Sequence, residues 1–350
     1  MDSRLMSQVK VTSAEVAALA GVSQSAVSRV FTPGASASAK TALKVRQAAV
    51  KLGYRPNSIA RAMVSGKSRI IGLVVAYLEN QFYPEALEKL SAMLQDRGYH
   101  VLIFMANTAT DNLDEILDEI LDYQVDGIVA ASVALSSQLL DRCQNAGVPV
   151  VLFNRSQDLQ SLSSVTSDNL KGGRKVADFL LATAPNRIGY IAGWEGASTQ
   201  RDREFGFRQR LAEAGRDIDV RTIGNFHMDS ARQATLEMFD REAPPDAIFV
   251  ANDHMAFAVM DTLRFEIGLS VPHDVSVVGY DDVPTAAWRA YDLTTVRQPV
   301  NQMVARTVDT LLRQIDDPSS TPSRVALDGP LIIRRSARLP EGWTNETLCE

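Results

Sequence analysis

The stretch VTSAEVAALAGVSQSAVSRVF, residues 11–31, predicts two short helices joined by a tight turn. Thr12 and Glu15 have the spacing of a capping box, in which each side chain accepts a hydrogen bond from a backbone N–H at the start of a helix. Gly21 tolerates the left-handed backbone conformation in which many helices end. Ser23 has a side chain suited to cap the second helix. The stretch therefore predicts a helix, a turn and a second helix in close succession.

The two predicted helices each have an apolar face and a polar face. The residues expected to face inward are Val16, Leu19 and Ala20 in the first helix and Val27, Val30 and Phe31 in the second. The second helix keeps an outward face of hydrogen-bonding groups and one guanidinium, carried by Gln24, Ser25, Ser28 and Arg29. Such a face is what reading base edges in the major groove of DNA requires. An ordinary helical hairpin fits the same stretch.

A third helix and a set of short motifs follow. Ser38–Leu52 has apolar residues at heptad spacing, and Gly53 is placed to end that helix. The motifs are GYRPN at 53–57, SIARAMVSGK at 58–67, FVANDHMAFAVM at 249–260, DVSVVGYDD at 274–282 and LTTVRQP at 293–299. In this order they resemble the LacI/GalR family of bacterial transcription repressors. The resemblance extends over about the whole chain.

Charge is divided unevenly along the chain. The net charge of the 350 residues is −6, but residues 1–67 hold ten Lys or Arg against two Asp or Glu. The first part therefore carries +8 and the remainder −14. A small basic part joined to a large acidic part is the asymmetry expected when only the first part meets phosphates.

Length and composition set broad limits. A chain of 350 residues favours two or three domains, and 45% hydrophobic residues supply ample core. The sequence has no run of about 20 apolar residues, so no membrane span is predicted. The first ten residues lack an apolar signal core, which favours a cytoplasmic location. Cys143 and Cys349 do not suggest a disulfide framework.

From Arg69 onward, apolar runs alternate with segments of helical spacing. Strands are predicted at 70–78, 100–106, 126–132 and 148–154, then, after a polar linker at 155–164, at 187–193, 221–226, 246–252 and 274–281. Helices are predicted at 84–97, 111–123, 136–145, 170–183, 200–214, 230–239, 255–268 and 301–313. Near-continuous apolar strands alternating with helices indicate parallel sheets covered on both faces.

The resemblance implies a domain plan and a fold. An all-α helix-turn-helix DNA-binding domain takes residues 1–57, a hinge helix or linker 58–67, an effector-binding and dimerisation domain 68–343, and a tail 344–350. The effector domain is expected to be a two-lobed, periplasmic-binding-protein-like α/β domain with parallel sheets. Lobe 1 takes about 68–167 and 298–325, and lobe 2 about 168–297 and 326–343. The chain would thus cross between lobes three times, with LTTVRQP returning it to the first lobe.

Two segments of the chain are predicted to contact DNA. On the second helix, Gln24 can pair with adenine and Arg29 with guanine or phosphate, while Ser25 also fits a solvated face. The segment 57–65 is too short to hold a helix alone in water, and a flexible linker fits it as well. The resemblance implies a hinge helix that folds on the operator, where Met63 takes the place of the family's Leu as a wedge in the minor groove. The predicted DNA contacts are Thr12, Ser23, Gln24, Ser25, Ser28, Arg29, Lys40, Tyr54, Arg55, Asn57, Ala60 and Met63.

Polar and aromatic residues are predicted to meet in the cleft between the lobes. Arg203 matches a family position that clamps effector hydroxyls or carboxylates, a task suited to a guanidinium fork. Asn252 and Asp281 end predicted strands, where ligands sit in α/β sheets. The predicted effector contacts are Phe82, Tyr83, Asn154, Thr199, Arg203, Phe226, Asn252, Asp281 and Gln298. Outside this set, Asp282 is expected to cap the following turn and His254 to start a helix, and Trp194 fits either the cleft or the core surface.

The pattern favours a regulator over two other classes of protein. The four His are isolated, and the sequence contains no HExxH, G-x-S-x-G or Gly-rich phosphate loop, so no catalytic, metal or cofactor site is predicted. A periplasmic sugar-binding protein would share the two lobes but would not need the basic first part. We therefore predict a homodimeric repressor that binds a near-palindromic DNA operator under the control of a small effector, with a sugar or sugar derivative preferred. A nucleobase, a sugar acid or a protein co-effector remain the alternatives.

Overall fold

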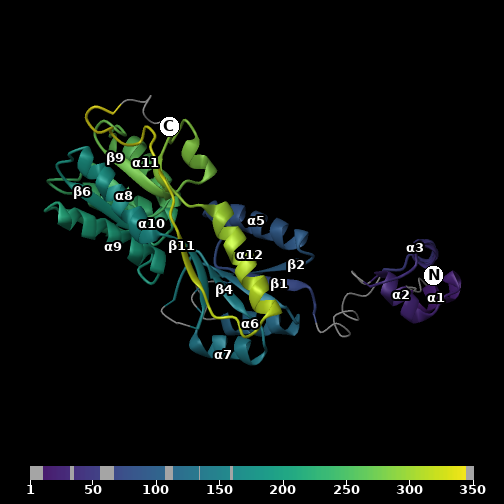
Figure 1. The fold of residues 1–350 in the computed structure, drawn as a ribbon. Helices are drawn as coiled ribbons and strands as arrows, with labels where there is room; N and C mark the ends of the chain where they lie inside the picture. Colours follow the sequence, from purple (N-terminus) through teal and green to yellow (C-terminus); the bar gives the residue numbers. More distant parts are fainter. Residues whose placement is uncertain are drawn as a thin grey trace, which may run out of the picture. The chain divides into compact units, whose positions relative to one another are not determined.

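The computed structural model of the protein describes residues 11–31, 35–55, 67–106, 113–133, 135–157 and 161–343. The chain forms two compact units, Met1–Arg69 and Ile70–Glu350 (Figure 1). Most of the predicted hinge, residues 58–66, and the predicted tail, 344–350, lie outside the described residues. Within the described part, no helix is both long enough and apolar enough to cross a membrane.

The first unit contains three helices, α1 (Ser13–Ala20), α2 (Gln24–Phe31) and α3 (Ala39–Leu52). Their shared core consists of Val16, Ala17, Ala20, Val27, Val45, Ala48 and Ala49. The capping box at the start of α1 is present, and Gly21 ends the helix with a φ of 65°. The three helices thus begin and end where the local sequence predicts.

The prediction that Leu19 faces inward is wrong, because its side chain is 46% exposed. The buried stripe of α1 runs through Val16, Ala17 and Ala20. At 3.6 residues per turn, position 19 lies about 100° around the axis from the middle of that stripe. The small Ala17 therefore takes the inward position in place of the larger Leu19.

The first lobe of the second unit is built on a parallel sheet with the strand order β11-β5-β4-β3-β1-β2. The strands are β1 (Ile70–Val75), β2 (His100–Met105), β3 (Gly127–Ala131), β4 (Val150–Phe153), β5 (Ser163–Ser167) and β11 (Arg324–Leu327). The helices are α5 (Phe82–Asp96), α6 (Leu113–Asp122), α7 (Ser137–Asn145) and α12 (Val300–Asp316). Helices α5 and α12 pack together on one side of this sheet, and α6 and α7 lie on the other (Figure 1).

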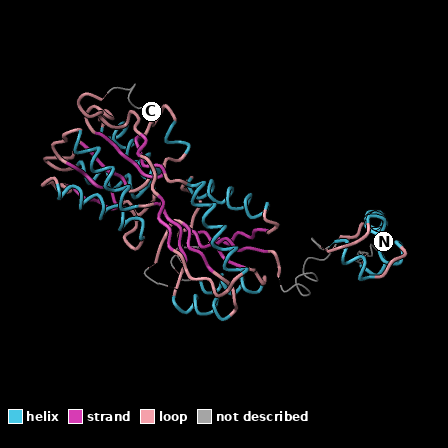
Figure 2. Tube along the Cα trace, in the orientation of Figure 1, coloured by secondary structure: helices cyan, strands magenta, loops and turns pink. Residues whose placement is uncertain are grey.

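The second lobe repeats this arrangement with the strand order β12-β10-β9-β8-β6-β7. Its strands are β6 (Ile188–Ala192), β7 (Val220–Ile223), β8 (Ala247–Val250), β9 (Ser276–Asp281), β10 (Thr294–Arg297) and β12 (Leu331–Ile332), the last antiparallel to β10. The helices are α8 (Asn169–Ala182), α9 (Ser198–Glu213), α10 (Met228–Phe239) and α11 (Asp253–Asp261), with a π-helical turn at Thr262–Ile267 and a 3-10 turn at Pro284–Ala287. In both lobes the strands lie inside the helical layers (Figure 2).

The order of the strands shows how the chain passes between the lobes. It leaves the first sheet after β5, returns after β10 through α12, and leaves again after β11 to form β12. The strand within LTTVRQP, β10, pairs with β9 of the second sheet, so the return begins after Arg297. The predicted two-lobed α/β fold with parallel sheets is confirmed.

The strands β5, β10 and β11 were not predicted, and β5 is the most unexpected of them. The segment Ser163–Ser167 was assigned in part to a polar linker, yet it forms β5 between β4 and β11. The hydroxyl of Ser163 is hydrogen-bonded inside the protein, since its Oγ accepts hydrogen bonds from Gln314 Nε2 and the Ser323 backbone N–H, at 2.9 and 3.0 Å. Buried serines cost little when they are hydrogen-bonded, so a polar segment can form an interior strand.

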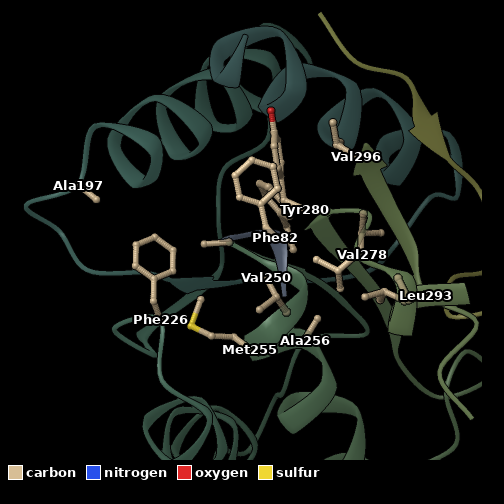
Figure 3. Close-up of a cluster of buried hydrophobic side chains, with 14 of the residues drawn as sticks. Phe82, Ala197, Phe226, Val250, Met255, Ala256, Val278, Tyr280, Leu293 and Val296 are labelled. Atoms are coloured by element: carbon tan, nitrogen blue, oxygen red, sulfur yellow. The ribbon is translucent and has the colours of Figure 1, made fainter. Parts of the chain in front are cut away.

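The largest cluster of buried apolar side chains contains residues from both lobes. Figure 3 draws part of it, with Val250, Val278 and Val296 from neighbouring strands of the second sheet and Phe82 from α5 of the first lobe. Phe226 and Met255 belong to the same cluster. This apolar cluster also borders the polar cavity between the lobes that is described below.

Candidate functional site

The outward face of α2 is a row of exposed polar side chains. Gln24, Ser25, Ser28 and Arg29 are exposed, whereas Val27 is buried. Ser23 Oγ accepts a hydrogen bond from the Ala26 backbone N–H at 3.2 Å, as predicted for a cap. Gln24 Nε2 donates to Ser13 Oγ at 2.8 Å, which ties α2 to the start of α1. The helix thus presents donors and acceptors to solvent from a fixed backbone.

The other predicted DNA contacts of the first unit lie near the ends of α1 and α3. Thr12 caps α1, Lys40 is exposed in the first turn of α3, and Arg55 is exposed after that helix. Tyr54 packs on Phe31 with ring centroids 5.9 Å apart, so its ring also supports the core. The remaining three predicted contacts, Asn57, Ala60 and Met63, lie outside the described residues.

A small polar cavity lies between the two lobes of the second unit. The residues that line it are Tyr77, Asn80, Tyr83, Asn154 and Arg155 from the first lobe and Thr199, Arg203, Phe226, Asn252 and Asp281 from the second. Its volume is about 10 Å³, room for about one water molecule. Seven predicted effector residues are among these, which places most of the predicted set around one point.

Two predicted effector residues do not line the cavity. Phe82 is buried against Phe153, with stacked rings whose centroids are 6.0 Å apart. Gln298 lies behind Asp281, and its Nε2 donates a hydrogen bond to Asp281 Oδ1 at 2.7 Å. Phe82 thus supports the apolar core, and Gln298 orients a residue of the cavity.

Arg203 is held on three sides by the second lobe. Its Nε donates to Asn169 Oδ1 at 2.8 Å, and one terminal nitrogen donates to the Ala251 carbonyl at 2.6 Å. The other terminal nitrogen donates to Asp281 Oδ1 at 3.4 Å, and the guanidinium carbon lies 3.7 Å from the centroid of the Tyr280 ring. With 2% of its surface exposed, Arg203 is fixed before any ligand arrives.

Asp281 joins the two lobes. Its Oδ2 accepts a hydrogen bond from Asn80 Nδ2 of the first lobe at 3.0 Å, while Arg203 and Gln298 reach its Oδ1 from the other side. Burial raises the pKa of Asp281, and the Arg203 guanidinium opposes that rise. A second bridge lies nearby, where Thr285 Oγ1 donates to Gln81 Oε1 at 2.8 Å. These contacts hold the lobes against each other.

Asp253 was not among the predicted residues, and it lies behind the wall of the cavity next to Asp281. It is completely buried, and it accepts hydrogen bonds from Thr295 Oγ1 at 2.6 Å and from the Val283 backbone N–H at 3.1 Å. Burial raises its pKa, and the negative charge of Asp281 raises it further. Asp253 thereby ties the start of α11 to β10 and to the loop after β9.

The first-lobe wall of the cavity combines a hydroxyl chain with unused donors and acceptors. Asn154 Nδ2 donates to the Tyr83 hydroxyl at 3.0 Å, and that hydroxyl shares a 2.6 Å hydrogen bond with Ser132 Oγ. Within the described residues, Asn154 Oδ1 and Arg155 Nε are buried without a hydrogen-bond partner. Two polar atoms of this wall therefore remain available to a ligand. On the second-lobe wall, Arg203 and Asp281 are already hydrogen-bonded within the protein.

Tyr77, Asn80 and Arg155 line the cavity but were not predicted. Arg155 was assigned to the polar linker after the fourth strand, and the available signal was its place directly after Asn154 at a strand end. Trp194, left open between cleft and core, is 45% exposed and lies against Arg155, whose guanidinium carbon is 5.3 Å from its ring centroid. Trp194 thus covers Arg155 and does not line the cavity.

The expected roles of two other residues have different outcomes. His254 lies in the first turn of α11, as predicted, and burial lowers its pKa. Asp282 was expected to cap the following turn, and this is wrong. It accepts hydrogen bonds from Arg297 Nε at 2.6 Å and from an Arg334 terminal nitrogen at 2.7 Å, and so joins β10 to the segment after β12.

Comparisons with known proteins agree on the kind of molecule. Residues 12–57 match the model of the bacterial regulatory proteins of the lacI family, and residues 177–337 match that of the periplasmic binding protein-like domain. The HTH-type transcriptional regulator CelR of Thermobifida fusca is 32% identical over 330 residues, which cover 92% of this chain and 96% of that protein. The HTH-type transcriptional regulator DegA of Bacillus subtilis is 30% identical, covering 94% and 98%.

Solved structures support the same conclusion. A CelR–cellobiose complex has a TM-score of 0.71 and 30% identity, covering 94% of this chain and 100% of that one. A Lac repressor dimer bound to operator and an anti-inducer has a TM-score of 0.84 and 27% identity, covering 94% and 99%. These relatives are named as transcriptional regulators and not as enzymes. With similarity along nearly its whole length, the chain belongs to the lacI family of bacterial regulatory proteins, the helix-turn-helix transcriptional regulators.

Proposed function

We propose that the protein is a sequence-specific, operator-binding repressor whose affinity for DNA is controlled by a small polar effector of the sugar class. The observation that carries this proposal is the presence in one chain of an exposed polar helix face on a basic unit and a polar cavity between two lobes. Two relatives support the effector class: one is solved with cellobiose, and another is the sucrose operon repressor of Streptococcus mutans, 30% identical over 308 residues.

The DNA-binding half of the proposal rests on α2. Gln24 and Arg29 have the donors and acceptors that read adenine and guanine, and each good pair contributes about 1–3 kcal/mol of discrimination. The +8 charge of residues 1–67 supplies the salt-dependent attraction to phosphates. Because such operators are near-palindromic, we propose that the protein acts as a homodimer in the cytoplasm. A strictly monomeric protein in light scattering would contradict this assembly.

The switching half rests on the contacts between the lobes. A sugar ring does not fit into a space that holds about one water molecule, so an effector can enter only if the lobes separate. That separation must break the Asn80–Asp281 and Gln81–Thr285 hydrogen bonds. An effector that prefers one lobe arrangement over the other shifts operator affinity, and the operator shifts effector affinity by the same factor.

The test begins with the operator. Selection from random duplexes with the full-length protein should yield a near-palindromic site. That site, labelled, is then titrated with protein in the presence of sugars, sugar acids, polyols and nucleobases. The proposal requires that at least one sugar or sugar derivative change the midpoint, and that the change follow effector concentration. Binding without any sequence preference would contradict the repressor, and a response to nucleobases alone would contradict the effector class.

A further inference from the structure

Arg155 is a largely buried residue for which no hydrogen bond or ion pair is found within the described part of the chain. Only 8% of its surface is exposed, and it lines the cavity between the lobes. Its Nε is fully enclosed without a hydrogen-bond partner, and no ion pair with a described carboxylate involves it. Its guanidinium carbon lies 5.3 Å from the centroid of the uncharged Trp194 ring. Enclosing a polar N–H without a hydrogen-bond partner costs free energy, so this position needs an explanation.

The carboxylates nearby are already engaged. The charged residues that line the cavity are Arg155, Arg203 and Asp281. Asp281 accepts hydrogen bonds from Arg203, Asn80 and Gln298, so its charge is balanced within the protein. Asp253 does not line the cavity and is fully used by Thr295 and Val283. Among the described residues, the wall of the cavity therefore has one positive charge in excess, and that charge belongs to Arg155.

A second unsatisfied group lies next to it in the sequence. Asn154 Oδ1 is a buried acceptor without a described partner, and it lines the same cavity. Arg155 thus offers several N–H donors in a planar fork, and its neighbour offers one acceptor for a hydroxyl. A carboxylate with a hydroxyl close to it has the complementary groups, because carboxylates accept two parallel hydrogen bonds from a guanidinium.

We infer that the effector is a sugar acid, a uronate or an aldonate, whose carboxylate is bound by Arg155 and whose neighbouring hydroxyl donates to Asn154. This inference rests on the proposed function and narrows its effector class. Arg203 serves the hydroxyls on the opposite wall, since Asn169, Ala251 and Asp281 already hold it in place. Arg155 is then a specificity residue that separates acids from neutral sugars.

The experiment compares matched acids and neutral compounds on the full-length protein. Calorimetric titrations at neutral pH and equal ionic strength use glucuronate against glucose, galacturonate against galactose, and gluconate against glucitol. We expect one acid to bind at least thirtyfold tighter than its neutral partner. Arg155→Gln should lower the affinity for that acid at least tenfold, since it removes the charge and the fork but keeps one amide. Arg155→Lys, which keeps the charge alone, should fall between the two.

A matched control and a folding check keep the result interpretable. Arg241→Gln removes a surface arginine that pairs with Glu237 and does not line the cavity, so it should leave acid binding unchanged. Because Arg155 has no described hydrogen-bond or ion-pair partner to lose, Arg155→Gln should not lower the unfolding temperature of the ligand-free protein. If it fails to fold, the comparison of acids with neutral sugars on the unchanged protein still decides the question.

Each outcome separates this inference from the proposed function. Tighter binding of the neutral partners would overturn the inference and leave a sugar-controlled repressor in place. Equal acid affinity in Arg155→Gln and the unchanged protein would overturn the role of Arg155. If no compound of the six binds while the selected operator does, the inference and the sugar class both fail and the DNA-binding regulator stands. Loss of operator selectivity would instead count against the proposed function itself.

Discussion

Polar side chains are exposed on the outward face of α2, whereas they are buried in the cavity between the lobes. On α2 the side chains of Gln24, Ser25 and Arg29 are exposed and come from consecutive turns of one short helix. In the cavity, Asn80, Arg203 and Asp281 are buried and come from segments up to 201 positions apart. An exposed face can be changed one residue at a time, whereas a buried network responds as a unit. Salt should therefore act chiefly on the first region, and pH chiefly on the second.

The largest effect should follow from Arg203→Ala in the buried network. Loss of hydrogen bonds from a charged group costs about 1.5–3 kcal/mol, so effector affinity should fall roughly ten- to a hundredfold. Titration of effector against labelled operator should then show a response only at roughly ten- to a hundredfold higher effector concentration, while the operator affinity of the effector-free protein stays nearly unchanged. Arg201→Ala, a change at an exposed position on the same helix, serves as the control. An unchanged effector response would mean that the ligand binds elsewhere.

Next in size is Arg29→Ala on the exposed face. We expect at least tenfold weaker operator binding, because one guanidinium contact to a base or phosphate is lost. Effector binding to the second unit should be unaffected, and circular dichroism should show folded helices. Lys51→Ala, also an exposed change in the first unit, provides the comparison. Equal operator affinity in Arg29→Ala and the unchanged protein would remove Arg29 from the predicted DNA contacts.

An effect on stability, and not on binding, should appear in the buried region with Asp253→Asn. Burial raises the pKa of Asp253. Between the ordinary aspartate pKa, about 3.9, and the raised folded value, the unfolded chain has released a proton that the folded protein keeps. The free energy of unfolding therefore falls as pH rises through this range, by at most about 1.4 kcal/mol per pH unit.

The Asn side chain has no such proton to lose. The free energy of unfolding of the variant should therefore rise relative to that of the unchanged protein between pH 5 and pH 8. Urea unfolding followed at both pH values measures the difference. Asp240→Asn, at an exposed position after α10, is the control. A relative stability that does not change with pH would show that Asp253 keeps an ordinary pKa.

The smallest effect should come from Lys40→Ala, a change at an exposed position of the first unit. If Lys40 contacts a phosphate, its loss lowers the dependence of operator affinity on salt by about 0.9 in the logarithmic slope. Discrimination between the operator and a base-substituted site should stay the same. Measuring both duplexes at four salt concentrations separates these quantities. A loss of discrimination with an unchanged slope would assign Lys40 to base reading.

Most of the predicted cavity residues came from the family resemblance, and two came from their place at the ends of strands. Asn252 and Asp281 end predicted strands, and the carboxyl ends of parallel strands meet at one edge of a sheet. Arg203 and Thr199 came from the family resemblance, and both line the cavity. Phe82 was expected beside them, but its ring faces Phe153 in the core. Which of two adjacent aromatics, Phe82 or Tyr83, turns to the cavity depends on packing that a linear pattern does not contain.

The sequence by itself determined the local features. Thr12 with Glu15, and Gly21, set the ends of α1 through contacts within a few residues, so these were correct in advance. The outward polar row of α2 likewise follows from helical periodicity. The +8 charge of residues 1–67 is a property of composition alone.

Only the tertiary structure decided which polar side chains are buried and which remain without a partner. Arg155 belongs to a segment that resembles a solvated linker, and Asp253 to one that resembles a helix start. Arg155 is enclosed because Trp194 and Ser198 of the other lobe close over its segment, and Asp253 because Thr295 and Val283 reach it from distant strands and loops. Burial and charge pairing are sums over neighbours in space, and those neighbours are assigned only when the chain has folded.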